Sequence, residues 1–83
     1  MSKKLSIPAY AGLGQRLRAA RRARRLTQRE LAARAGISAT AVYLLERIGA
    51  GRSRTIYLAE LAGALGVSVE WLGLGLGPPE PLG

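Results

Sequence analysis

The sequence LTQRELAARAGIS, at residues 26–38, contains the starts of two successive helices. Thr27 and Glu30 have the T-x-x-E spacing of a capping box, in which each side chain accepts a hydrogen bond from the other residue's backbone N–H. Leu26 and Leu31 flank this box as a hydrophobic staple, which fixes the direction in which the chain enters the helix. The pattern predicts a helix that begins directly after the threonine.

A tight joint connects this helix to the next one. Gly36 suits the left-handed conformation in which many helices end, and Ile37 begins a second staple in which Ser38 is the N-cap. The two helices, predicted at 28–35 and 39–47, are therefore separated by only three residues. A glycine in a short joint between two short helices is the signature of a helix-turn-helix motif.

Three more helices are predicted around this pair. Apolar residues with a helical period predict one helix over 13–24 and another over 55–65, with Ser53 or Thr55 as the N-cap of the second. Val67 and Leu72 form a third staple around the N-cap Ser68, which predicts a short helix over 69–73. No segment alternates between apolar and polar residues as a half-buried β-strand does. The predicted fold class is therefore all-α, with five helices.

The charge of the chain is distributed unevenly. Its 83 residues include 13 lysines and arginines and five glutamates, which gives a net charge of +8. Residues 1–34 contain ten of the bases and one acid, whereas residues 35–83 contain three bases and four acids. Most of the bases are arginine, which pairs with phosphate as a bidentate fork. The asymmetry favours nucleic acid as the partner over an anionic membrane or an acidic protein.

Several residue types that enzymes and metal sites need are absent from the sequence. The chain has no histidine, aspartate or cysteine, which excludes histidine-based catalysis, disulfides and most zinc and calcium sites. No apolar stretch reaches the roughly 20 residues of a membrane span, and the N-terminus lacks the apolar centre of a signal peptide. We therefore expect a cytoplasmic protein that is not an enzyme and has no cofactor, metal or evident small-molecule ligand.

Several segments together resemble the phage-repressor and Cro-type (XRE) helix-turn-helix family. The most specific are LTQ-x-x-LA at residues 26–32 and LGVS-x-x-WL at residues 65–72, and the resemblance covers about residues 13–72. It implies a compact, lambda-repressor-like bundle of five helices whose third helix lies in the DNA major groove, in a dimer bound to two half-sites. It also implies a bacterial or phage origin.

The composition along the chain, together with the extent of the resemblance, divides the chain into three parts. We expect a basic N-terminal arm at 1–12, a helix-turn-helix DNA-binding domain at 13–73 and a Gly-, Leu- and Pro-rich tail at 74–83. Members of the family often continue into a second domain after this point, and we expect none here.

The candidate DNA-binding residues come from the resemblance and from a helical wheel of residues 39–47. The wheel separates an inward face, with Val42 and Leu45, from an outward face, which consists of Thr40, Tyr43, Leu44 and Arg47. Gln28 matches a phosphate-contacting position at a helix N-terminus, which favours anions. The loop after the third helix supplies two more arginines. The candidate set is Gln28, Ser38, Ala39, Thr40, Tyr43, Leu44, Arg47, Arg52 and Arg54.

The positions that match base-reading residues of the family carry unusual side chains here. Ala39 and Thr40 occupy the main ones, and Leu44 lies one turn further along the helix. Alanine cannot hydrogen-bond a base edge, and leucine can make only apolar contact, for instance with a thymine methyl group. Tyr43, Arg47 or the shape of the DNA would have to supply the remaining specificity.

Other matched positions have structural or oligomeric roles in the family. Arg21 and Glu46 match a partly buried ion pair that joins the first helix to the third. Most arginines of the first helix are expected to form a solvated face, and Arg25 stands where a glycine commonly ends that helix. The candidate dimer contacts are Trp71, Leu72 and Leu74, and Trp71 suits the core equally well.

We therefore expect a sequence-specific regulator that binds double-stranded DNA, represses transcription and forms a homodimer. The alternative is a protein-interaction module on the same fold, such as an antitoxin subunit or an antirepressor. It is motivated by the apolar residues Tyr43 and Leu44 on the outward face, because exposed apolar groups often mark a protein contact. A membrane-bound basic helix is disfavoured, because residues 13–72 have the pattern of a globular core.

Overall fold

The computed structural model describes residues 12–49 and 57–79. These ranges contain five helices and no strand, which confirms the all-α fold class. In chain order the helices are α1 (Leu13–Ala23), α2 (Gln28–Ala35), α3 (Ala39–Ile48), α4 (Leu58–Leu65) and α5 (Val69–Leu74). Within the described ranges, no helix is both long and apolar enough to cross a membrane.

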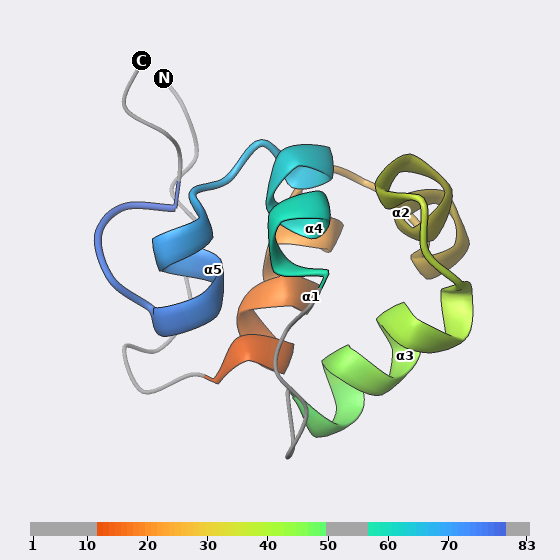
Figure 1. The fold of residues 1–83 in the computed structure, drawn as a ribbon, viewed down its shortest axis with the longest axis horizontal. Coiled ribbons are helices and arrows are strands. Elements are labelled where there is room, and N and C mark those ends of the chain that lie inside the picture. Colours follow the sequence, from red (N-terminus) through yellow and green to blue (C-terminus); the bar gives the residue numbers. More distant parts are fainter. Residues whose placement is uncertain (1–11, 50–56, 80–83) are drawn as a thin grey trace.

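The five helices form a bundle with α1 and α4 at its centre (Figure 1). α2 and α3 lie on one side of the bundle and α5 lies on the other. α1 packs against α3 and α5, and α4 packs against α2 and α5. The helix-turn-helix pair α2 and α3 is thus held from behind by the rest of the domain.

The core receives apolar side chains from every helix. Leu17 of α1, Leu31 of α2 and Val42 of α3 are completely buried, as is Leu72 of α5. Each such side chain stabilises the fold by roughly 1.5–3 kcal/mol relative to an exposed one. The remaining buried apolar residues are Ala20, Leu26, Ala32, Ala35, Leu61, Ala62, Leu65, Val67 and Trp71.

The structure places Trp71 and Leu72, two of the possible dimer contacts, in the interior of the domain. Both side chains belong to the core of the single chain, where only 6% of the Trp71 surface remains exposed. Side chains already covered by their own chain offer little surface to a partner. Leu74, in contrast, is 71% exposed and stays a candidate dimer contact.

The predicted helix starts are present with their capping hydrogen bonds. The Thr27 Oγ1 atom accepts from the Glu30 N–H at 3.0 Å, and the Glu30 carboxylate accepts from the Thr27 N–H at 2.8 Å. The hydroxyl oxygens of Ser38 and Ser68 each accept from a backbone N–H three residues later, at 3.0 Å. Gly36 ends α2 with a φ of +74°, in the left-handed region that favours glycine.

The start of α4 differs from the sequence prediction. The helix begins at Leu58 rather than at residue 55, and it is preceded by Tyr57, whose side chain makes no capping bond. Ser53 and Thr55, the two expected N-caps, lie outside the described residues, and neither directly precedes the helix. No local capping signal marks this start.

The end of α1 departs from ordinary backbone geometry. Arg25 has a φ of +57°, and no other non-glycine residue in the described ranges has a positive φ. An L-residue in this conformation is disfavoured by roughly 1–2 kcal/mol, which explains why glycine is common at the matching position. Arg24 lies beyond the helix, and its Nε atom donates to the Leu65 carbonyl at the end of α4, at 2.8 Å.

The segment after α5 folds back onto the start of that helix. The Ser68 N–H donates to the Pro79 carbonyl at 2.7 Å, and the Ser68 hydroxyl donates to the Pro78 carbonyl at 3.3 Å. Gly75 ends α5 in a left-handed conformation. Residues 75–79 are therefore attached to the domain by hydrogen bonds at both ends of α5.

Candidate nucleic-acid interface

The outward face of α3 is exposed as the helical wheel predicts. Thr40, Tyr43, Leu44 and Arg47 are all exposed, and Val42 is buried on the opposite face. Sequence reasoning missed Ile48, because the helix was expected to end one residue earlier. Ile48 is 64% exposed and lies one turn after Leu44. Its spacing of four residues from Leu44 is the signal that could have found it.

The N-terminus of α3 presents fewer free side chains than the candidate set suggests. The Ser38 hydroxyl is exposed, but its oxygen already serves as the N-cap by accepting from the Ala41 N–H. Ala39 is half-buried and packs against the core. Thr40 is therefore the exposed polar side chain at this end of the helix.

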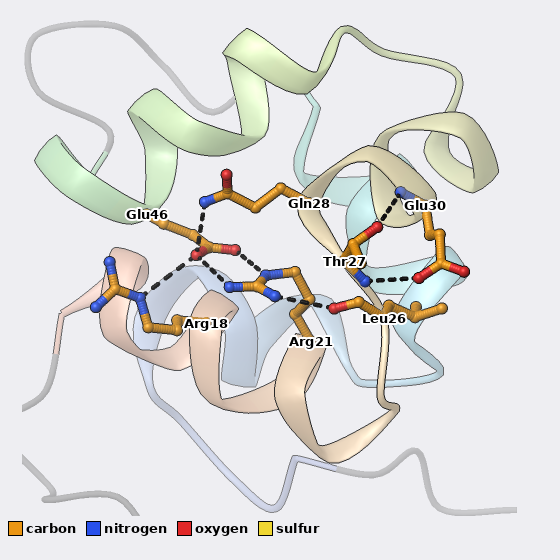
Figure 2. Close-up of polar contacts among 7 residues, drawn as sticks. All are labelled: Arg18, Arg21, Leu26, Thr27, Gln28, Glu30 and Glu46. Atoms are coloured by element: carbon orange, nitrogen blue, oxygen red, sulfur yellow. Dashed lines mark hydrogen bonds and ion pairs between the residues drawn. The ribbon is translucent and has the colours of Figure 1, made fainter.

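A buried carboxylate fixes α3 to the two helices before it (Figure 2). Glu46 projects from α3 with a side chain that is 0% exposed. The Arg21 guanidinium donates to both of its oxygens, from Nε at 2.6 Å and from Nη2 at 3.0 Å. Gln28 donates from Nε2 at 3.1 Å, and Arg18 donates from Nε at a longer 3.4 Å. The expected ion pair of Arg21 with Glu46 is thus the centre of a larger cluster.

The cluster keeps Glu46 ionised. Burial alone would raise the pKa of this carboxyl, but the hydrogen bonds from Arg21 and Gln28 outweigh burial, and the pKa lies below its ordinary value. The hydrogen bond to Glu46 likewise raises the pKa of the Arg21 guanidinium. Both groups therefore carry full charge at neutral pH.

The cluster also joins the loop between α1 and α2. The Nη1 atom of Arg21 donates to the Leu26 carbonyl at 2.9 Å, directly before the capping box. Arg21 thus connects the end of α1, the entry to α2 and the buried side of α3. This connection fixes how α3 presents its exposed face.

Gly14 allows α1 to approach α3 closely enough for this cluster to form. A Cβ atom at this position would lie 2.5 Å from the Glu46 carbonyl oxygen and 2.8 Å from the Leu45 carbonyl oxygen. Both distances are shorter than van der Waals contact, and both neighbours are backbone atoms that cannot rotate away. The absence of a side chain is therefore needed here for packing.

Gln28 has a structural contact that the sequence did not indicate. It is the first residue of α2 and is half-buried. Because a carboxylate can only accept, the Gln28 amide nitrogen must face Glu46, and the amide group has a second N–H beyond this bond. The expected phosphate contact would therefore come from a side chain that Glu46 already holds in place.

The arginines of α1 are less uniformly solvated than expected. Arg16 is buried, and its guanidinium donates from Nε to the Leu72 carbonyl at 3.0 Å and from Nη2 to the Gly73 carbonyl at 3.1 Å. Burial lowers the pKa of Arg16. Arg16 and Arg24 thus satisfy carbonyl groups at the ends of α5 and α4. Sequence reasoning missed both roles, because the partners lie more than 40 residues away.

The exposed basic residues lie mainly on the first three helices. The described residues with an exposed arginine side chain are Arg18, Arg22, Arg24, Arg25, Arg29, Arg34 and Arg47. Arg52 and Arg54, two members of the candidate DNA-binding set, lie outside the described residues, as do residues 1–11 of the N-terminal arm. In the described part of the chain, no group of three or more acidic residues is arranged to hold a metal ion.

Both the sequence and the fold of the chain resemble those of known proteins. The profile of a family described as helix-turn-helix matches residues 17–72. No curated protein sequence matches the chain. Solved structures, in contrast, match over most of the domain.

Three of the solved structures illustrate the similarity. The P22 c2 repressor in complex with a synthetic operator is 29% identical with a TM-score of 0.70, over 80% of this chain and 98% of that chain. The N-terminal DNA-binding domain of SinR from Bacillus subtilis is 28% identical with a TM-score of 0.66, over 72% and 87%. The restriction-modification controller protein C.AhdI from Aeromonas hydrophila is 35% identical with a TM-score of 0.64, over 72% and 89%.

Proposed function

The chain belongs to the phage-repressor and Cro-type helix-turn-helix family of DNA-binding transcription regulators, and from this premise we propose that it is a repressor that binds its operator as a homodimer. In this proposal α3 enters the major groove of double-stranded DNA. The observation that carries it is the exposed outward face of α3 on a helix that the Glu46 cluster fixes from behind.

Phosphate contacts would supply most of the affinity. The exposed arginines of α1, α2 and α3 provide charge next to α3, and Arg47 lies on α3 itself. At the start of α2, Gln28 and the free backbone N–H groups favour a phosphate. Such contacts position the protein on the duplex without reading its sequence.

The proposal predicts a steep dependence of affinity on salt. With about four to six phosphate contacts per subunit, the slope of log affinity against log salt would be about −7 to −11 for a dimer. Fluorescence anisotropy with a labelled duplex, at several salt concentrations, measures this slope. A slope near zero would contradict phosphate neutralisation as the binding mechanism.

The surface of α3 is tested with a variant and a matched control. Thr40→Ala combined with Tyr43→Ala removes two exposed side chains from the outward face, so we expect a large loss of affinity for the preferred duplex. Val69→Ala removes an apolar side chain of similar exposure from α5, and we expect no loss there. Equal affinities of the two variants for the duplex would mean that the outward face of α3 does not contact DNA.

The homodimer is part of the proposal and has one exposed candidate contact. Leu74, at the end of α5, is largely exposed, and a second copy of the chain would cover it. Leu74→Ser should raise the concentration at which DNA binding becomes half-maximal without unfolding the domain. Sedimentation measured with and without DNA would show whether two copies bind one duplex.

A protein-interaction module on the same fold remains the second candidate function. The exposed apolar residues Tyr43, Leu44 and Ile48 favour it, and SinR, one of the similar proteins, occurs in a solved complex with SinI. The Thr40→Ala and Tyr43→Ala variant separates the two functions. Loss of DNA binding with retained binding to a protein partner supports the regulator, and the reverse supports the interaction module.

A further inference from the structure

The exposed face of α3 carries a stripe of methyl-bearing side chains. Thr40, Leu44 and Ile48 follow one another at intervals of four residues, so they lie one above the other on the helix. All three are exposed, with 44% of the Leu44 surface and 64% of the Ile48 surface open to solvent. We call these three residues the methyl stripe.

The methyl stripe limits the chemistry that α3 can use on base edges. Leu44 and Ile48 have no hydrogen-bonding groups, and Ala39, at the start of the helix, has none either. Thr40 offers a methyl group beside its hydroxyl. In the major groove only thymine presents an apolar group, its 5-methyl, while the other bases present hydrogen-bond donors and acceptors.

The exposed charges on α2 and α3 favour a polyanion as the partner of the methyl stripe. α2 and α3 carry the exposed arginines Arg29, Arg34 and Arg47, and Glu30 is the one exposed acid on these two helices. The other acid, Glu46, is buried and paired. An exposed apolar stripe on a pair of helices whose exposed charges are mostly positive fits a duplex, whose phosphates flank the methyl groups in its groove.

From this arrangement we propose that the protein recognises its operator through thymine 5-methyl groups packed against the methyl stripe, more than through hydrogen bonds to base edges. The proposal rests on the proposed DNA-binding function and adds the chemical feature that is read. Thr40 and Ile48 are eight positions apart, which is about 12 Å along the helix axis. That length covers about three to four base steps at 3.4 Å each.

The test replaces thymine by uracil in the tightest duplex recovered from a random-sequence selection. The exchange removes only the 5-methyl group and keeps the base pair and its hydrogen-bonding groups. Each methyl that packs against the stripe should be worth about fourfold in affinity, the value of one buried methylene-sized group. We expect this loss at one or more thymines in each half-site and none outside the half-sites.

A second exchange separates methyl contact from hydrogen bonding. At a uracil-sensitive position, the T·A pair is replaced by C·G or by 5-methylcytosine paired with G. A methyl contact predicts that the methylated cytosine restores at least half of the affinity lost with cytosine. If methylation of the cytosine changes nothing, the position is read by hydrogen bonds and the proposal is wrong there.

Protein variants assign the effect to the stripe. In Leu44→Ala the loss caused by uracil should shrink below twofold at the position that Leu44 contacts, while Val69→Ala should retain the full loss. Thermal unfolding of Leu44→Ala, whose side chain is already half exposed, checks that the domain remains folded. If uracil is as harmful to Leu44→Ala and Ile48→Ala as to the unchanged protein, the stripe does not read the methyl groups.

The failure of this proposal differs from failure of the proposed function. Methyl recognition is overturned, and the regulator is left intact, if the protein binds a selected duplex with a steep salt slope but loses less than about 1.5-fold in affinity at every uracil. A loss of that size is only a small part of the value of one methyl group. Absence of any preferred duplex overturns both.

Discussion

Removing Arg21 leaves a carboxylate without its main partner inside the protein. Arg21→Met keeps much of the side-chain volume and its helix propensity, but it deletes both hydrogen bonds to Glu46 and the bond to the Leu26 carbonyl. The Glu46 side chain is 0% exposed, so water cannot replace the guanidinium. Breaking a buried ion pair from one side costs about 3–5 kcal/mol of unfolding free energy.

That loss is large for a domain of this size. Native domains have roughly 0.05–0.15 kcal/mol of stability per residue, which gives about 4–12 kcal/mol for a chain of this length. Arg21→Met should therefore unfold at a much lower urea concentration, or be partly unfolded without urea. Circular dichroism at pH 7, measured during urea and thermal unfolding, gives the difference directly.

Arg18→Met is the matched control for this change. Arg18 contacts the same carboxylate, but its Nε atom lies 3.4 Å away and its side chain is 47% exposed, compared with 13% for Arg21. An ion pair with a half-exposed partner contributes about 0–1 kcal/mol. The two variants make the same exchange of arginine for methionine, so a difference in their stability reports the burial and the geometry of the arginine that is lost.

A double variant separates the value of the pair from the penalty of an unpaired charge. Arg21→Met with Glu46→Leu removes both charges and fills the space with apolar groups, which is often neutral in buried pairs. We expect it to recover most of the stability lost in Arg21→Met. The reasoning is refuted if Arg21→Met costs no more than Arg18→Met, or if the double variant is less stable than Arg21→Met.

Three further predictions concern the backbone and pH. Arg25→Gly should stabilise the domain by about 0.5–1 kcal/mol, because relief of the left-handed strain exceeds the entropy that glycine loses on folding; a lower melting temperature would contradict this. Gly14→Ala should lower the free energy of unfolding by about 1–3 kcal/mol, because its Cβ would meet the backbone of α3 at 2.5 Å. Gly63→Ala is the control: Gly63 lies in α4, a Cβ there would meet nothing within 4 Å, and the change should stabilise the domain by about 0.5–1 kcal/mol. Equal effects of the two substitutions would refute the close approach at Gly14. The pKa of Glu46 lies below its ordinary value of 4.5, so its contribution is complete above that pH and is lost as the pH falls through the lower folded pKa. Urea unfolding from pH 7 to pH 2 should show this loss of unfolding free energy, and the free energy should fall less steeply with pH in Glu46→Gln. An equally steep fall in Glu46→Gln would contradict a stabilising role of the ionised Glu46 carboxylate.

Local signals explain the parts of the fold that the sequence could predict. The caps at Thr27, Ser38 and Ser68 and the left-handed Gly36 involve residues within a few positions of one another. Those residue types at that spacing favour such hydrogen bonds at a helix start. The helix boundaries therefore follow closely from the sequence, and the exception is α4, which begins without a side-chain cap.

Contacts between distant residues explain what the sequence could not predict. The carbonyl partners of Arg16 and Arg24 lie at the ends of α5 and α4, and no spacing along the chain relates them. The bond from Gln28 to Glu46 joins α2 to α3 in the same way. The ion pair of Arg21 with Glu46 was expected only because the family resemblance supplied it.

The candidate site was predictable to a similar degree. The helical period of residues 39–47 gave the exposed face of α3 correctly, since it depends only on helix geometry. It missed Ile48 because the helix was predicted to end at Arg47, although Gly49, the C-cap with a φ of +79°, directly follows Ile48. The sequence alone leaves Trp71 open between the core and a dimer contact, because an apolar residue near the end of the domain suits either.

Selection of the purified protein on random duplex DNA at physiological salt, followed by sequencing of the retained molecules, tests the central claim most directly. We expect an enriched palindrome whose two half-sites are about 10 bp apart, as for two copies of α3 in successive major grooves. Retention without any enriched sequence, abolished as salt rises, would contradict this claim and leave only a basic surface.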